Sequence, residues 1–251
     1  MKILEYGDKS KEKLILIHGF QSPVTIWKPY IEHYKNDYHV IVPVITGHDP
    51  DKKEDFLSFA EEAKAIEEYC LSNSYKDIYA VYGMSMGGVV TAELWQNGRI
   101  NIKKVIMDGS PIHNPAVNII SRMQRSFYLD VTHKVQQGDR KTLEQARSIS
   151  EDSWYDDFIA VLKNMSDKTI LNCIDGISEF KLEYSKRCAE SGIYYFHGTK
   201  FNEILASASA KKLKKLYPHT VVKCFKGKSH CENAMHAPDV MIGELDRVLK
   251  L

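Results

Sequence analysis

One pentapeptide of the sequence has the residue types and spacing of a nucleophilic serine. Ser85 is the centre of GMSMG at 83–87, which follows the β-branched run IYAVY at 78–82 and precedes the helical run GVVTAELW at 88–95. A sharp turn from strand to helix exposes a serine hydroxyl at the carboxyl end of a sheet, and glycines on either side avoid steric clashes there. We therefore predict that Ser85 is the nucleophile of an acyl transfer, rather than an ordinary serine in a glycine-rich loop.

A second motif, HGFQ at 18–21, ends the first long apolar run. The backbone N–H groups of Phe20 and Met86 are candidates for an oxyanion hole, because Met86 begins a predicted helix and N–H groups at helix starts stabilise negative charge. His18 is predicted to brace this loop by hydrogen bonds rather than to take part in the chemistry.

The candidate general base is His230, in the loop SHCE after the last predicted strand. A base for Ser85 must lie at the same end of the sheet, and after this type of serine turn the histidine comes last in the chain. His219 precedes its strand and falls at the opposite end. His113 and His133 remain alternatives that would reach the site from the middle of the chain.

Short β-branched runs alternate with segments of helical period, and these elements must position the three motifs. The predicted strands are 14–18, 39–44, 78–82, 104–108, 193–197 and 220–225. Apolar residues recur at helical spacing in 55–71 and in 240–249. The alternation predicts an α/β fold with a mostly parallel, doubly wound sheet covered by helices on both faces.

One long segment, 113–188, contains no convincing strand. Its apolar positions keep helical spacing in two stretches, at Ala116, Ile119, Ile120, Met123 and Phe127, and at Trp154, Phe158, Val161, Leu162 and Met165. A structureless loop of this length is improbable inside a compact domain. We predict a helical cap over 113–188, inserted late in the sheet of a core made of 1–112 and 189–251.

The predicted cap follows the strand 104–108 and so begins beside the serine turn. Its apolar side chains Met123, Phe127, Trp154 and Phe158 are predicted to contact the substrate. A lidded cleft encloses roughly 300 to 1,000 Å³, which favours a small or medium ester over a long-chain lipid.

Composition excludes several functional classes. The 251 residues carry 34 Lys and Arg against 33 Asp and Glu, a net charge of +1, which gives no basis for nucleic-acid binding. Apolar runs are too short to span a membrane, and the N-terminal segment has no secretory pattern. Five scattered cysteines without a CxxC pair indicate a reduced, cytoplasmic protein without a zinc ribbon. We expect no metal and no cofactor; the oligomeric state is not predicted.

The chain resembles the α/β-hydrolase fold superfamily, in its capped, cofactor-free, esterase-like branch. The resemblance spans nearly the whole length and rests on HGFQ, PVITGHD, GMSMGG, the insertion after KVIMDGSP, and SHCENAMHAPD. It implies a serine hydrolase with a Ser-His-acid triad that cleaves a carboxylic ester or thioester. Two departures are Ser229, where the family usually has glycine, and a single short strand, KILEY, before 14–18. The sheet is accordingly expected to have about seven strands.

The resemblance leaves two candidates for the acid. Relatives usually place an aspartate shortly after the glycine that ends the strand before the last, and Phe201 occupies that position after Gly198. Glu203 follows two residues later and is the favoured acid. Asp108 is the alternative, because some relatives carry their acid after the earlier strand 104–108.

Two other functions remain open at this point. Hydrolysis of a carbon–carbon bond uses a similar set of residues. A catalytically silent hydrolase fold that serves as a binding module is the third interpretation; such a module would usually have lost the serine or the histidine, and both are present here.

Overall fold

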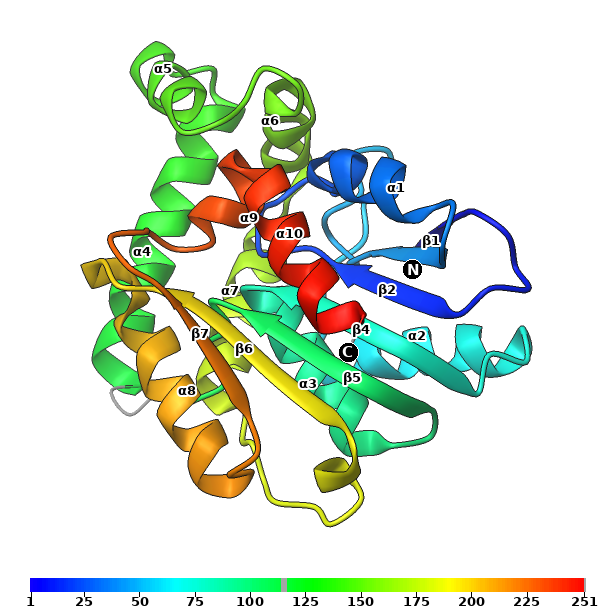
Figure 1. Cartoon of the computed structure of the whole chain (residues 1–251). Coiled ribbons are helices and arrows are strands. Elements are labelled where there is room, and N and C mark those ends of the chain that lie inside the picture. The colour runs from blue at the N-terminus through cyan, green and yellow to red at the C-terminus, as the bar shows by residue number, and fades with distance from the viewer. Residues whose placement is uncertain (114–116, 251) are drawn as a thin grey trace.

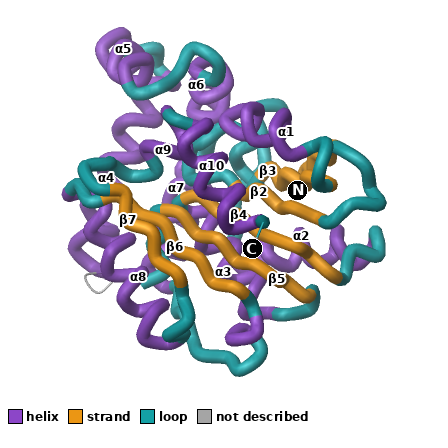
Figure 2. Tube along the Cα trace, viewed as in Figure 1, coloured by secondary structure: helices purple, strands orange, loops and turns teal. Residues whose placement is uncertain are grey.

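The computed structural model describes residues 1–113 and 117–250, and only the backbone of 117–120. Strands and helices alternate along most of the chain (Figure 2). Within the described residues the strands are β1 (Lys2–Tyr6), β2 (Lys13–Ile17), β3 (His39–Val44), β4 (Asp77–Met84), β5 (Asn101–Asp108), β6 (Gly192–Gly198) and β7 (Val221–Phe225). The helices are α1 (Lys28–Tyr34), α2 (Phe59–Ser72), α3 (Met86–Asn97), α4 (Val117–Gln136), α5 (Arg140–Ser148), α6 (Tyr155–Asn164), α7 (Asp167–Glu179), α8 (Ile204–Leu216), α9 (Glu232–His236) and α10 (Pro238–Leu249). Short 3-10 turns lie at η1 (Val24–Trp27), η2 (Cys188–Glu190) and η3 (Phe201–Glu203).

The strands form one mixed, mostly parallel sheet in the order β1-β3-β2-β4-β5-β6-β7. β1 is antiparallel to β3, and the other neighbours are parallel. In the register of the central strands, Asp108 pairs with Met84 of β4 and with Phe196 of β6. The carboxyl ends of β4, β5 and β6 therefore lie at one edge, where open α/β sheets bind their ligands. The predicted mostly parallel, doubly wound sheet of about seven strands is confirmed.

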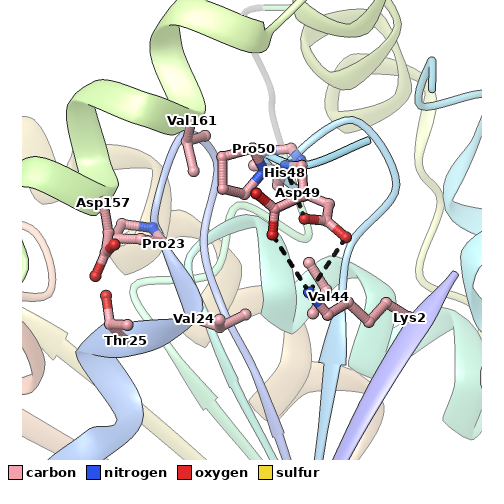
Figure 3. Close-up of a pocket in the computed structure, with 11 residues that line it drawn as sticks. Lys2, Pro23, Val24, Thr25, Val44, His48, Asp49, Pro50, Asp157 and Val161 are labelled. Carbon is pink, nitrogen blue, oxygen red and sulfur yellow. Dashed lines mark hydrogen bonds and ion pairs between the residues drawn. The ribbon is translucent and has the colours of Figure 1, made fainter. Parts of the chain in front are cut away.

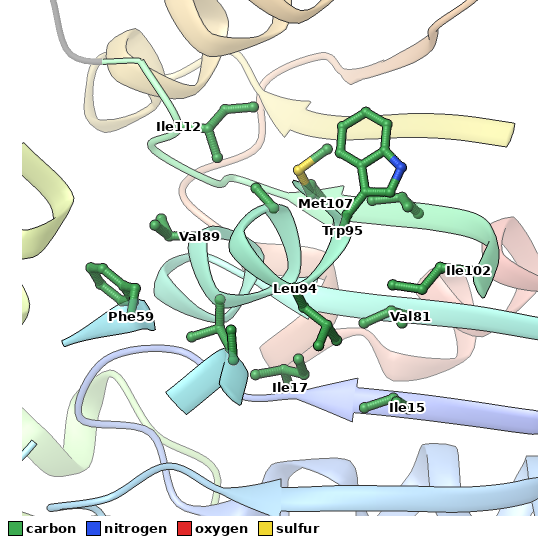
Figure 4. Packing of buried hydrophobic residues seen from close by; sticks show 14 of the residues in the cluster. Ile15, Ile17, Phe59, Val81, Val89, Leu94, Trp95, Ile102, Met107 and Ile112 are labelled. Atoms are coloured by element: carbon green, nitrogen blue, oxygen red, sulfur yellow. The ribbon is translucent and has the colours of Figure 1, made fainter. Parts of the chain in front are cut away.

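Both faces of the sheet are buried, which explains why the central strands are apolar throughout. In β2, Leu14 and Leu16 pack toward α1 and α10, while Ile15 and Ile17 pack toward α2 and α3. This alternation is the two-residue period of a strand. Figure 4 shows the layer between the sheet and α3, in which Ile15 and Ile17 lie below the helix that carries Val89 and Leu94.

Helices α4 to α7 form a cap between β5 and β6, and Figure 1 shows α4 and α6 at the end of the sheet to which the strand arrows point. Two small apolar clusters hold the cap together, one around Val135 and Leu162 and one around Val161 and Ile170. The helical pattern predicted for this segment is confirmed; Ala116, placed at the start of the first stripe, lies outside the described residues. No helix in the described ranges combines the length and apolar character needed to cross a membrane.

Candidate active site

Ser85 occupies a strained turn between β4 and α3. Its backbone has φ 52° and ψ −118°, in a region that non-glycine residues avoid at a cost of about 1–3 kcal/mol. The Ser85 N–H donates a hydrogen bond of 2.7 Å to the carbonyl of Asp108, so the end of β5 helps to hold the turn.

The two glycines of GMSMG are required by close contacts. A Cβ atom on Gly83 would lie 2.4 Å from the carbonyl oxygen of Gly87, and one on Gly87 would lie 2.3 Å from that of Ile17. These contacts give the spacing seen in the sequence its physical cause, because any larger residue would push the helix away from the strand.

His230 joins the serine to a carboxylate. Its Nε2 atom lies 2.8 Å from the Oγ of Ser85, and its Nδ1 atom is hydrogen-bonded to Oε1 of Glu203. The histidine lies in the loop between β7 and α9, where the next residue, Cys231, adopts a left-handed φ of 49°. The structure thus brings together three residues that are far apart in the sequence.

Glu203 is fixed at both carboxylate oxygens. While Oε1 faces His230, Oε2 accepts the N–H of Gly198 at 2.8 Å. The side chain is 2% exposed, at the end of η3. A carboxylate held in this way can fix the orientation and tautomer of the imidazole.

Asp108 lies one strand away and is equally buried, at 2% exposure. Its Oδ2 atom accepts a hydrogen bond of 3.2 Å from the Tyr82 hydroxyl, across to β4 rather than toward His230. Burial, and next the nearby charge of Glu203, raise the pKa of Asp108 to about 7. The two acids left open by the sequence therefore have different partners.

The HGFQ loop packs directly against the serine turn. His18 is buried: its Nδ1–H donates to the Gly19 carbonyl at 2.9 Å, and its Nε2 accepts the Ile45 N–H at 3.0 Å. Burial lowers the pKa of His18 to about 4, so it is neutral and braces the loop as predicted. A Cβ on Gly19 would lie 3.3 Å from that of Ser85. Phe20 thus follows the residue that touches the nucleophile turn.

Met86 is the first residue of α3. An N–H group at this position has no acceptor within its own helix, so it can bind an anion. The assignment of Phe20 and Met86 to an oxyanion hole stays a prediction.

The four cap residues predicted to contact the substrate have different surroundings. Met123 and Phe127 on α4 are 69% and 60% exposed, whereas Trp154 is buried. The Trp154 ring lies 5.9 Å from that of Phe158 and 6.0 Å from that of His236, so it packs the cap against α9. Their contact with substrate stays a prediction.

The cap residues that touch the HGFQ loop were not predicted from the sequence. Tyr128 and Thr132 of α4 contact Phe20 and Gln21, respectively. Their spacing of four places them on one helix face, but nothing in the sequence indicates that this face meets 18–21.

A small cavity of about 150 Å³ lies beside this loop, between α6 and the segment 48–51 (Figure 3). His48, Thr25 and Val161 are among its lining residues, and Ser85, His230 and Glu203 are not. It is therefore distinct from the space in front of the serine.

The chain matches no protein-family model and no curated protein sequence. It is similar to solved structures along its whole length. A protein from Desulfitobacterium hafniense, described as an α/β hydrolase family member, has a TM-score of 0.79 at 18% identity, covering 99% of this chain and 100% of that one. A carboxylesterase structure from Nitrososphaera gargenis has a TM-score of 0.73 at 16% identity, with coverages of 99% and 95%. An esterase from Thermogutta terrifontis has a TM-score of 0.68 at 16% identity, with coverages of 99% and 93%.

Proposed function

We propose that this chain, which has the α/β-hydrolase fold, is a serine hydrolase that cleaves a small or medium carboxylic ester or thioester through an acyl-enzyme on Ser85. The observation that carries the proposal is the chain of contacts from Ser85 Oγ through His230 to Glu203, on a strained turn at the carboxyl edge of the sheet. Side chains so arranged activate a serine hydroxyl.

In the acylation half of the proposed reaction, His230 Nε2 takes the Ser85 proton as Oγ attacks the acyl carbon. The N–H groups of Phe20 and Met86 hold the negative charge that develops on the carbonyl oxygen. Glu203 stabilises the imidazolium, and His230 returns the proton to the leaving alcohol or thiol.

In the second half, His230 takes a proton from water, which attacks the acyl carbon. Collapse of the intermediate releases the carboxylic acid and returns the proton to Ser85. Every proton transfer uses His230, so no other titrating group is required.

The substrate class is supported by the printed descriptions of two structural neighbours, a carboxylesterase and an esterase. Similarity at such low identity shows only the fold. The size of the acyl group is therefore inferred from the architecture of this chain. The cap lies over the serine's end of the sheet, and we assign size selection to it, with Met123, Phe127, Trp154 and Phe158 as candidate contacts.

The test is labelling by a fluorophosphonate together with hydrolysis of p-nitrophenyl acetate, butyrate, octanoate and palmitate. We expect labelling of the wild type, and loss of labelling and of roughly 10⁴-fold or more in turnover in Ser85→Ala. His230→Ala should be similarly impaired. Ser126→Ala removes an exposed serine on α4 and should behave as the wild type.

Labelling that persists in Ser85→Ala would contradict the nucleophile assignment. Cleavage of a β-diketone without cleavage of any ester would replace the ester assignment by carbon–carbon bond hydrolysis. Absence of both labelling and turnover in the wild type would favour a binding module.

A further inference from the structure

The turn after β2 is held by the cap as well as by the sheet. Phe20 and Gln21 are the central residues of this turn, which the Ser22 N–H closes by donating to the Gly19 carbonyl at 3.3 Å. Gln21 has a φ of 57°, in the left-handed region that favours glycine. A glutamine remains in that conformation only where its surroundings hold it there.

The surroundings that hold Gln21 belong to the cap. Its Nε2 donates a hydrogen bond of 2.9 Å to Thr132 Oγ1 on α4 and lies 3.9 Å from the sulfur of Met165. The Gln21 side chain is 7% exposed, Thr132 is fully buried and Met165 is nearly so. A hydrogen bond in such a dry environment is costly to break, because both partners would stay buried and unpaired.

The neighbouring residue docks on the same face of the same helix. The Phe20 ring meets the Tyr128 ring edge-on, with centroids 5.0 Å apart. Tyr128 and Thr132 are one helical turn apart, so a single face of α4 holds two consecutive residues of the turn. Phe20, the first of these two turn residues, is the one whose N–H is assigned to the oxyanion hole.

We propose that Gln21 is a positioning residue, which through its hydrogen bond to Thr132 lets the cap hold the Phe20 N–H in the direction that stabilises the oxyanion. This inference rests on the proposed function. Without the Thr132 anchor, Gln21 is free to leave the left-handed conformation. The Gly19–Phe20 peptide, which carries the Phe20 N–H, then rotates with the turn. Because the interaction acts on charge that develops in the transition state, its loss lowers kcat and leaves ground-state binding unchanged.

The test compares Gln21→Leu and Thr132→Val with the wild type. We expect each to lower kcat for p-nitrophenyl acetate by roughly ten- to hundredfold, less than the 10²–10³ lost when an oxyanion donor is removed. KM should stay nearly constant. The inhibition constant of a trifluoromethyl ketone, whose adduct with Ser85 carries the oxyanion, should rise by the same factor as kcat falls.

Two variants serve as controls. Thr132→Ser keeps the hydroxyl and should restore kcat. Asn172→Leu removes a different hydrogen bond between cap and body, the one to the Phe56 carbonyl at 2.8 Å, and should leave both kcat and the inhibition constant unchanged. Thermal unfolding of each variant checks folding, and if Gln21→Leu does not fold, the Thr132→Val and Thr132→Ser pair decides.

The inference is overturned if the wild type is active while Thr132→Val matches Asn172→Leu, or if ketone binding does not change with kcat. A wild type without Ser85-dependent hydrolysis overturns the proposed function, and this inference with it.

Discussion

The ends of β5 and β6 carry two carboxyl groups that are equally buried and differently bonded. Glu203, after β6, accepts two N–H donors, from His230 and from Gly198. Asp108, at the end of β5, accepts the phenol of Tyr82 at 3.2 Å. The two carboxyl groups are therefore equally buried but have different hydrogen-bond donors. The ends of neighbouring strands thus place two buried carboxyl groups in different hydrogen-bonding environments.

The surroundings of Asp108 favour its neutral form. Of the groups near it, Glu203 raises the pKa of Asp108, whereas His230 and the Tyr82 hydroxyl lower it. Burial is the largest influence, followed by Glu203, and together they raise the pKa of Asp108 to about 7. Asp108 thus stays protonated up to about neutral pH, chiefly because it is buried.

The largest expected effect comes from removing the carboxylate after β6. Glu203→Gln should lower kcat for p-nitrophenyl acetate by a factor on the order of 10³ to 10⁴, because the imidazole loses its fixed tautomer and the imidazolium loses its counter-charge. Steady-state kinetics at pH 8 measures the loss, and retained fluorophosphonate binding at long incubation shows that the site is still folded. Near-normal turnover would remove Glu203 from the triad.

The second prediction concerns stability and isolates Asp108. Its pKa is raised from 3.8 in the unfolded chain to about 7 in the folded protein, so between these pH values the folded state binds the extra proton. The stability that Asp108 provides is fully present below pH 3.8 and is lost as pH rises to about 7, on the order of 4 kcal/mol. Asp108→Asn cannot ionise and should be more stable than the wild type at pH 8, with the difference shrinking toward pH 5.

Urea unfolding at pH 5, 6, 7 and 8 checks this prediction. A gap between wild type and Asp108→Asn that stays constant or widens as pH falls would mean that Asp108 is ionised throughout the range.

The sequence favoured Glu203 over Asp108 as the acid but did not show what would bring Glu203 to His230, and the answer lies in the 198–203 turn. The N–H groups of Thr199 and Lys200 both donate to the carbonyl of Lys228, two residues before His230. A Cβ on Gly198 would lie 2.2 Å from that same oxygen, so only glycine allows this approach. These contacts between backbone segments far apart in the sequence place Glu203 beside His230, and no local sequence pattern encodes them.

Helical spacing likewise predicted the cap helices but not what their faces meet. A stripe of apolar residues shows which side chains share a face, and its partner is set by the path of the loops. Met123 and Phe127, chosen from such a stripe, are mostly exposed, whereas Tyr128 and Thr132 meet the HGFQ turn. By contrast, the sheet and the serine turn could be predicted because strand alternation and glycine spacing are local.

The third prediction concerns the activity that remains when Asp108, rather than Glu203, loses its carboxylate. Asp108→Asn should stay within about tenfold of the wild type in kcat, because the side chain of Asp108 bonds Tyr82 and the backbone carbonyl that holds Ser85 is unchanged. Measuring kcat of Asp108→Asn and of Glu203→Gln under the same conditions gives the ratio of the two losses. Equal losses in the two variants would show that both carboxyl groups act on His230.

The smallest effect is expected from Tyr82→Phe, which removes the hydroxyl that donates to Asp108 and leaves the ring packed against Trp27. The lost hydrogen bond should cost about 1 kcal/mol of stability. Because the Tyr82 hydroxyl lowers the pKa of Asp108, its removal raises that pKa further, and the fall of stability with rising pH should continue beyond about pH 7.

The measurement is the free energy of unfolding of Tyr82→Phe compared with that of Tyr82→Phe/Asp108→Asn from pH 5 to 9. The double variant lacks the titrating group, so the difference between the two cancels all other ionisations. A decline that ends at a lower pH than in the wild type would mean that the Tyr82 hydroxyl favours the protonated acid, which would contradict its role in lowering the pKa of Asp108.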